Sequence, residues 1–194
     1  QPRAREGSGC AGAARSLGGG GAACARGTGA AAQQEEAAAQ RAGRQANEIT
    51  LIAVTKTHPL EVIRAALQAG VRLFGENYAE EGVMKIQSLP AQSGVEWHMI
   101  GHLQRNKAKS AVQLFEVIET LDSVALAREL DKEGRKNDIV VRTLIEINLA
   151  AEESKSGIAK AQAGELLRAV GELSHLKVEG LMTVPPLRGN PEDV

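Results

Sequence analysis

The sequence is poor in aromatic residues, cysteine and net charge, and each shortage excludes a class of protein. All four aromatic side chains lie between residues 74 and 115, and the two cysteines, Cys10 and Cys24, have no histidine at metal-ligand spacing. We therefore expect neither a disulfide framework nor a zinc site. A formal net charge of −1 gives no electrostatic case for binding nucleic acid or an anionic membrane. No apolar run approaches the roughly 18–20 residues that cross a bilayer. The cysteine pattern is compatible with a reducing cytoplasm.

The N-terminal stretch differs in composition from the rest of the chain. Residues 1–33 are mostly Gly, Ala and Arg and include no aromatic residue. Such a segment buries too little apolar surface to offset its ordering entropy, so we expect it to be disordered. We interpret it as a non-native addition from a misread frame or a fusion. It lacks the continuous apolar core of a secretory signal, and its few serines disfavour a transit peptide. An amphipathic helix is expected only at 35–46, and the folded domain is predicted to span 34–194.

After residue 48, short apolar runs alternate with helical patterns, which is typical of βα units around a parallel sheet. Pro59 is placed to start the first helix, Gly70 to end it in a left-handed conformation, and Ser123 to cap a later one. The pattern predicts an α/β fold, either an open doubly wound sheet or most of a (β/α)8 TIM-type barrel. Six strands are expected, at 49–56, 72–75, 96–100, 116–121, 139–149 and 177–184, with a helix at 158–174 between the last two.

Lys56 closes the first of these strands, in the segment 51–59 (LIAVTKTHP). Alternation along the strand puts Ile52, Val54 and Lys56 on one face. At the end of an apolar file an ammonium is poorly hydrated, which lowers its pKa and favours the neutral amine that condenses with an aldehyde. The alternative is a lysine whose stem covers apolar surface while its charge reaches water.

Four more segments extend this observation. They are 72–78 (RLFGENY), 96–106 (EWHMIGHLQRN), 147–157 (INLAAEESKSG) and 179–185 (EGLMTVP). Together with 53–59, and in this order, they closely resemble the pyridoxal phosphate homeostasis protein family, from about residue 38 to the end of the chain. The resemblance favours a barrel like the N-terminal domain of alanine racemase. It also implies that the chain stops after about the sixth strand and lacks the last two.

The resemblance implies a protein that stores, buffers or delivers pyridoxal 5′-phosphate, held as a Schiff base on Lys56, without established turnover. Apo-enzymes that use this cofactor are the candidate partners, and we expect a cytoplasmic monomer. In the family, the groups that hold the phosphate come from the last two strands, so we expect the cofactor to be held weakly here.

Three further residues are candidate cofactor contacts because they stand near predicted strand ends, where barrels place their chemistry. Asn77 suits a hydrogen bond to the cofactor and equally a helix N-cap. His98 suits the pocket or a hydrogen-bonded place in the core, and Met182 is more typical of a core. A tight loop at 154–157 is expected to use a positive φ at Gly157. No catalytic residue and no metal ligand is assigned.

Three other functions remain open at this level. A fold-type III racemase or decarboxylase would use the same lysine but needs a second base, and the sole tyrosine is Tyr78. A Schiff-base aldolase would use the lysine without a cofactor. A degenerate fragment would have no activity.

Overall fold

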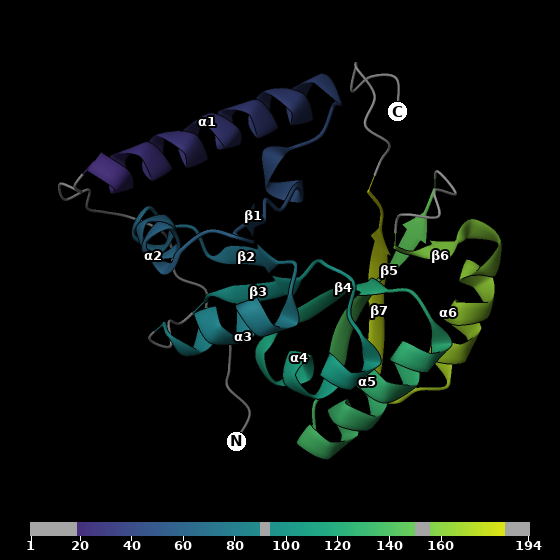
Figure 1. Cartoon of the computed structure of the whole chain (residues 1–194). Coiled ribbons are helices and arrows are strands. Elements are labelled where there is room, and N and C mark those ends of the chain that lie inside the picture. Colours follow the sequence, from purple (N-terminus) through teal and green to yellow (C-terminus); the bar gives the residue numbers. More distant parts are fainter. Residues whose placement is uncertain (1–18, 90–93, 150–155, 185–194) are drawn as a thin grey trace.

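The computed structural model describes residues 19–89, 94–149 and 156–184 (Figure 1). Its strands are β1 (Ala53–Val54), β2 (Leu73–Glu76), β3 (Glu96–Met99), β4 (Val117–Leu121), β5 (Val141–Asn148), β6 (Ile158–Ala159) and β7 (Leu176–Met182). Its α-helices are α1 (Gly19–Arg41), α2 (Leu60–Gln68), α3 (Ala79–Gln87), α4 (Ala108–Leu114), α5 (Val124–Asn137) and α6 (Ala163–Gly171). Short 3-10 helices are η1 (Ala46–Glu48), η2 (Arg105–Lys107) and η3 (Lys160–Gln162). No helix in these ranges is long and apolar enough to cross a membrane.

All strand pairs are parallel, which confirms the predicted α/β class. The strands follow one another in the order β1, β2, β3, β4, β5, and β5 pairs with both β6 and β7. Within the described residues β1 pairs only with β2 and β7 only with β5, so the sheet curves like a barrel that is not closed. Parallel strands end at one edge of the sheet, and the loops of that edge carry the site.

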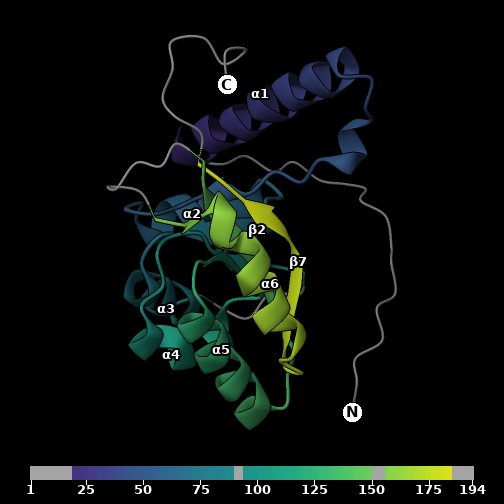
Figure 2. The same ribbon diagram turned by 90° about the vertical axis from the view of Figure 1, so that its right-hand side faces the viewer.

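The helices α3 to α6 cover one face of this sheet, and α1 lies apart from them, across α2 (Figures 1 and 2). Apolar residues at helical spacing lie on one face of a helix, and this face is buried in α2, as Ile63, Ala66 and Leu67 show. Phe74 and Trp97 stack between β2 and β3 with ring centroids 5.0 Å apart. The core therefore lies between the sheet and its helices, and the opposite face of the strands is free to hold polar side chains.

The turn chemistry follows the sequence closely. Gly70 has φ 96° after α2 and Gly157 has φ 105°, as predicted for residues without a Cβ atom. The Ser123 hydroxyl accepts a hydrogen bond of 3.4 Å from the backbone N–H of Leu126, which confirms the predicted cap of α5. Pro59 stands one position earlier than expected, as the N-cap of α2.

Three elements differ from the prediction. β1 covers only Ala53–Val54, because the chain turns at Lys56 and Thr57. The last predicted helix starts late, because Ile158 first pairs with Ile147 as the short strand β6. α1 begins at Gly19, well before residue 35, and so includes part of the stretch expected to be disordered. Its alanines favour helix, and Ala39 is 1% exposed. Residues 1–18, the rest of that stretch, lie outside the described residues.

Candidate functional site

Strand register brings two of the candidate residues to the same level of the sheet. Val54 pairs with Gly75, and each is followed two positions later by a candidate, Lys56 and Asn77. The last residues of β2 and β3, Glu76 and Met99, are also paired. The carboxyl ends of β1, β2 and β3 therefore form one rim, as in barrels that carry their chemistry there.

Lys56 lies in an exposed turn after β1, and its amine has no hydrogen bond or ion pair with any described residue. The apolar file that was expected to surround it is absent, since Val54 on the same face is 47% exposed. The prediction of a poorly hydrated amine at the end of a buried strand is therefore wrong. What the structure provides instead is an accessible, unpaired amine.

The backbone on either side of Lys56 is held by side chains. Thr55 is buried, its hydroxyl donates to Glu76 Oε1 at 2.7 Å, and its carbonyl accepts from Lys85 Nζ at 2.6 Å. Thr57 adopts the left-handed φ of 63°, which is unusual for a β-branched residue. Its N–H donates to Glu81 Oε1 at 2.7 Å. A lysine with a free side chain thus sits on a turn fixed at both ends.

Lys85 of α3 links these contacts. Its ammonium lies 2.8 Å from Glu76 Oε1 and 2.7 Å from Glu81 Oε1. Hydrogen bonding to Lys85 lowers the pKa of Glu81, so this carboxylate stays ionised and able to accept from the Thr57 amide. The buried ion pair therefore belongs to the support of the lysine turn.

At the same rim a cavity of about 250 Å³ opens between the ends of β2, β3 and β5. Its polar lining residues are Asn77, His102, Glu146, Asn148 and Ser156. Gly101 lets the chain after β3 pass close to the backbone of Asn77: a Cβ atom there would lie 2.0 Å from the carbonyl oxygen of Asn77. Asn77 does not cap α3, whose N-cap is Tyr78. Its role as a cofactor contact stays a prediction.

Glu146 is the most unusual residue of the cavity, and the sequence analysis missed it. It is 6% exposed, and its Oε2 has no hydrogen-bond partner among the described residues. Burial raises the pKa of this carboxyl, and the charge of Asp122 adds to that effect, while His102 opposes it. A glutamate between two isoleucines, Ile145 and Ile147, inside a predicted strand was the signal that the sequence offered.

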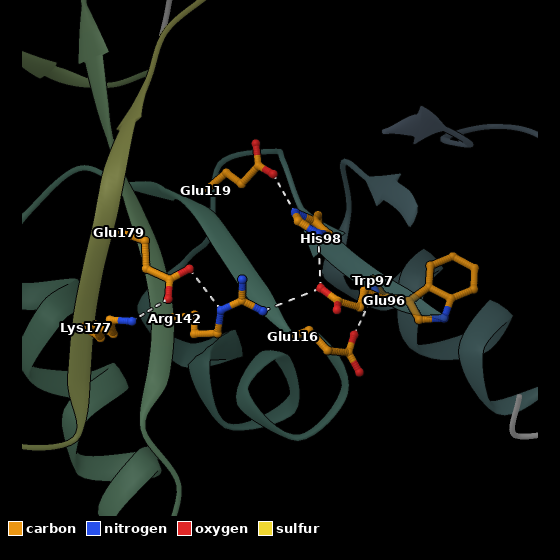
Figure 3. A network of polar contacts seen from close by, with 8 residues as sticks. All are labelled: Glu96, Trp97, His98, Glu116, Glu119, Arg142, Lys177 and Glu179. Carbon is orange, nitrogen blue, oxygen red and sulfur yellow. Dashed lines mark hydrogen bonds and ion pairs between the residues drawn. The ribbon is translucent and has the colours of Figure 1, made fainter. Parts of the chain in front are cut away.

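His98 belongs to a network of polar contacts (Figure 3). It pairs with Gly75, below Asn77, and its Nδ1 is 2.6 Å from Glu119 Oε1. Its Nε2 lies 4.0 Å from Glu96, which Arg142 reaches at 3.4 Å. This polar network inside the curved sheet agrees better with the alternative of a hydrogen-bonded interior histidine than with a pocket wall.

Met182 ends β7 and pairs with Glu146 of β5. Because the two residues are paired, Met182 stands beside Glu146 at the strand ends. Its side chain is half-buried. In the part of the chain that the structure describes, no group of three or more His, Cys, Asp or Glu residues is arranged to hold a metal ion.

Comparisons with known proteins agree with this geometry. The family model of the alanine racemase N-terminal domain matches residues 27–193. The pyridoxal phosphate homeostasis protein of Escherichia coli K12 is 44% identical over 149 residues, which are 76% of this chain and 64% of the relative. The chain therefore spans less than two thirds of that protein. The protein of the same name from Aquifex aeolicus is 43% identical over 155 residues, 80% of this chain and 68% of the relative.

A solved structure shows the same fold. PipY, the COG0325 family member of Synechococcus elongatus PCC7942, matches in its form with PLP bound at a TM-score of 0.68 and 33% identity. The match covers 82% of this chain and 73% of PipY. The barrel of the alanine racemase type, predicted from the sequence resemblance, is thereby confirmed.

Proposed function

Because the chain belongs to the families of the alanine racemase N-terminal domain and of the pyridoxal phosphate homeostasis proteins, we propose that it binds pyridoxal 5′-phosphate and serves its homeostasis in the cell. One observation carries the proposal for this chain. The amine of Lys56 is exposed and has no partner among the described residues, on a fixed turn at the same rim of the sheet as Asn77.

The residues at the rim fit the aldehyde and the ring of this cofactor. The neutral amine of Lys56 condenses with an aldehyde to a Schiff base and releases one water molecule. The Asn77 amide both donates and accepts, as a ring hydroxyl requires. The cavity of about 250 Å³ lies just below the roughly 300–1,000 Å³ of most ligand sites, which suits a single substituted ring.

The phosphate group has a different requirement. A phosphate is bound by backbone N–H groups or by cationic side chains. The residues that line the cavity include neither lysine nor arginine. We therefore propose that the cavity takes the ring and that the phosphate lies outside it.

We propose binding without turnover, since the relatives are named as homeostasis proteins. An exposed amine suits a bond that forms and hydrolyses freely, which a store or donor of the cofactor needs. Met182 would flank the ring beside Glu146, and His98 would support the rim from below. Recipient apo-enzymes, the cytoplasm and a monomeric state are parts of the same proposal.

Reduction with borohydride tests this function. The full chain is incubated with pyridoxal 5′-phosphate, reduced, digested and mapped by mass spectrometry. We expect the pyridoxyl group on the Lys56 peptide, its loss in Lys56→Ala, and its retention in Lys109→Ala, which removes another exposed lysine. Labels spread over lysines according to exposure would contradict the proposal. Racemisation of an amino acid that disappears in Lys56→Ala would favour the racemase alternative.

A further inference from the structure

Glu146 occupies a place in β5 where a charge is poorly tolerated. Its neighbours Ile145 and Ile147 are buried in the core on the other face of the strand. In the pair of strands β5 and β7, the partner of Glu146 is Met182, whose thioether has no hydrogen-bond donor and no charge. One of its carboxyl oxygens is buried without a partner among the described residues. Burying such a group without a hydrogen bond costs free energy, so an unpartnered oxygen in a ligand-sized cavity calls for an explanation.

The titratable groups around Glu146 do not supply a counter-ion. Asp122, at the end of β4, is an acid and repels a carboxylate. His102, after β3, lies 3.1 Å from Asp122, and its side chain is 53% exposed, so its attraction for Glu146 is shared and screened. Asn77 and Ser156, from the β2 and β6 sides of the cavity, are uncharged. Burial raises the pKa of Glu146, in agreement with this arrangement.

We propose that the Glu146 carboxyl is a ligand contact that donates its proton in a hydrogen bond to an acceptor atom on the ring of a pyridoxal-type ligand. This inference rests on the proposed function and names a specificity residue of that site. A neutral carboxyl has one O–H donor and an accepting oxygen, so it matches an unprotonated ring nitrogen, or the oxygen of the hydroxyl group on the ring, that faces it. Its ionised form has no donor and repels the same atom. Binding therefore weakens as the pH rises through the titration of Glu146.

The experiment uses pyridoxine 5′-phosphate, whose alcohol cannot form a Schiff base, so the covalent bond to Lys56 does not enter. Dissociation constants are measured by calorimetry on the full chain from about pH 5 to pH 9. Glu146→Gln keeps the shape and a donor but does not titrate. We expect the ratio of the wild-type to the Glu146→Gln constant to rise about tenfold across this range, the effect of one lost hydrogen bond. The ionisation of the ligand's phosphate is common to both proteins and cancels in the ratio.

Glu116→Gln is the matched control. Burial also raises the pKa of Glu116, but this residue precedes β4 at the opposite end of the strand and lines neither of the two described cavities that Asn77 borders. Its ratio to wild type should stay constant with pH. Glu146→Leu, which cannot donate, should bind about tenfold more weakly than Glu146→Gln at every pH.

Each outcome decides between the two proposals. A constant ratio of wild type to Glu146→Gln, or equal binding by the Glu146→Leu and Glu146→Gln variants, overturns the role of Glu146 and leaves the proposed function intact. Formation of the Lys56 adduct without measurable binding of pyridoxine 5′-phosphate has the same meaning. Absence of both the adduct and the binding overturns the proposed function and this inference with it.

Discussion

Replacing Lys85 by methionine should destabilise the protein strongly. The substitution keeps an unbranched, apolar stem but removes the ammonium that lies 2.8 Å from Glu76 and 2.6 Å from the Thr55 carbonyl. The side chain of Glu76 is 0% exposed, so its carboxylate would lose its counter-ion inside the protein. Removing one member of a buried ion pair costs about 3–5 kcal/mol. In a chain of this size each kcal/mol lowers Tm by about 2–4 °C, so we expect a decrease of roughly 6–20 °C.

Urea unfolding, followed by circular dichroism and by Trp97 fluorescence, measures this loss. Lys107→Met is the control, because Lys107 pairs with Glu80 at the surface, where the two side chains are 37% and 61% exposed. Exposed pairs contribute about 0–1 kcal/mol. The double variant Lys85→Met with Glu76→Gln should regain part of the loss, since no buried charge is then left alone. If Lys85→Met and Lys107→Met lose the same small amount, the buried ion pair does not hold the lysine turn as described.

Two further predictions concern the rim, tested by Gly101→Ala with Gly164→Ala as its control, and the interior of the sheet, tested by Glu116→Gln. Gly101→Ala would place a methyl group 2.0 Å from the Asn77 carbonyl oxygen and should cost about 1–3 kcal/mol and weaken cofactor trapping. Gly164→Ala on α6, with nothing within 4 Å, should instead stabilise by about 0.5–1 kcal/mol. Burial raises the pKa of Glu116 above its ordinary value of 4.5. Its stabilising contribution is therefore full below about pH 4.5 and lost as the pH rises through the folded-state pKa. Urea midpoints of wild type should fall relative to Glu116→Gln over that rise, and a pH-independent difference would contradict this.

Local features of the fold could be predicted from the sequence. Alternating apolar and helical patterns predict the βα order because each element must bury one face. Gly70, Gly157 and Ser123 were predictable for the same kind of reason, since their backbone positions depend on the residue itself.

What the sequence did not show depends on distant partners. The turn that ends β1 is held by a distant group, since the carbonyl of Thr55 accepts from Lys85, 30 residues later. His98 meets Glu119 across 21 residues. The burial of Glu146 is not visible in its local sequence, because it depends on the pairing of β5 with β4 and β7. Each of these required the register of strands that residue patterns leave open.

The left-handed residue after the lysine has a consequence for amide hydrogen exchange. Thr57 lies in an exposed turn, where backbone amides usually exchange rapidly with solvent. Its N–H is nevertheless bonded at 2.7 Å to Glu81, which is itself paired with Lys85. Exchange at this single position therefore requires that the Glu81 carboxylate first release the amide. A slow Thr57 amide among fast neighbours would measure how often the turn that carries the amine opens.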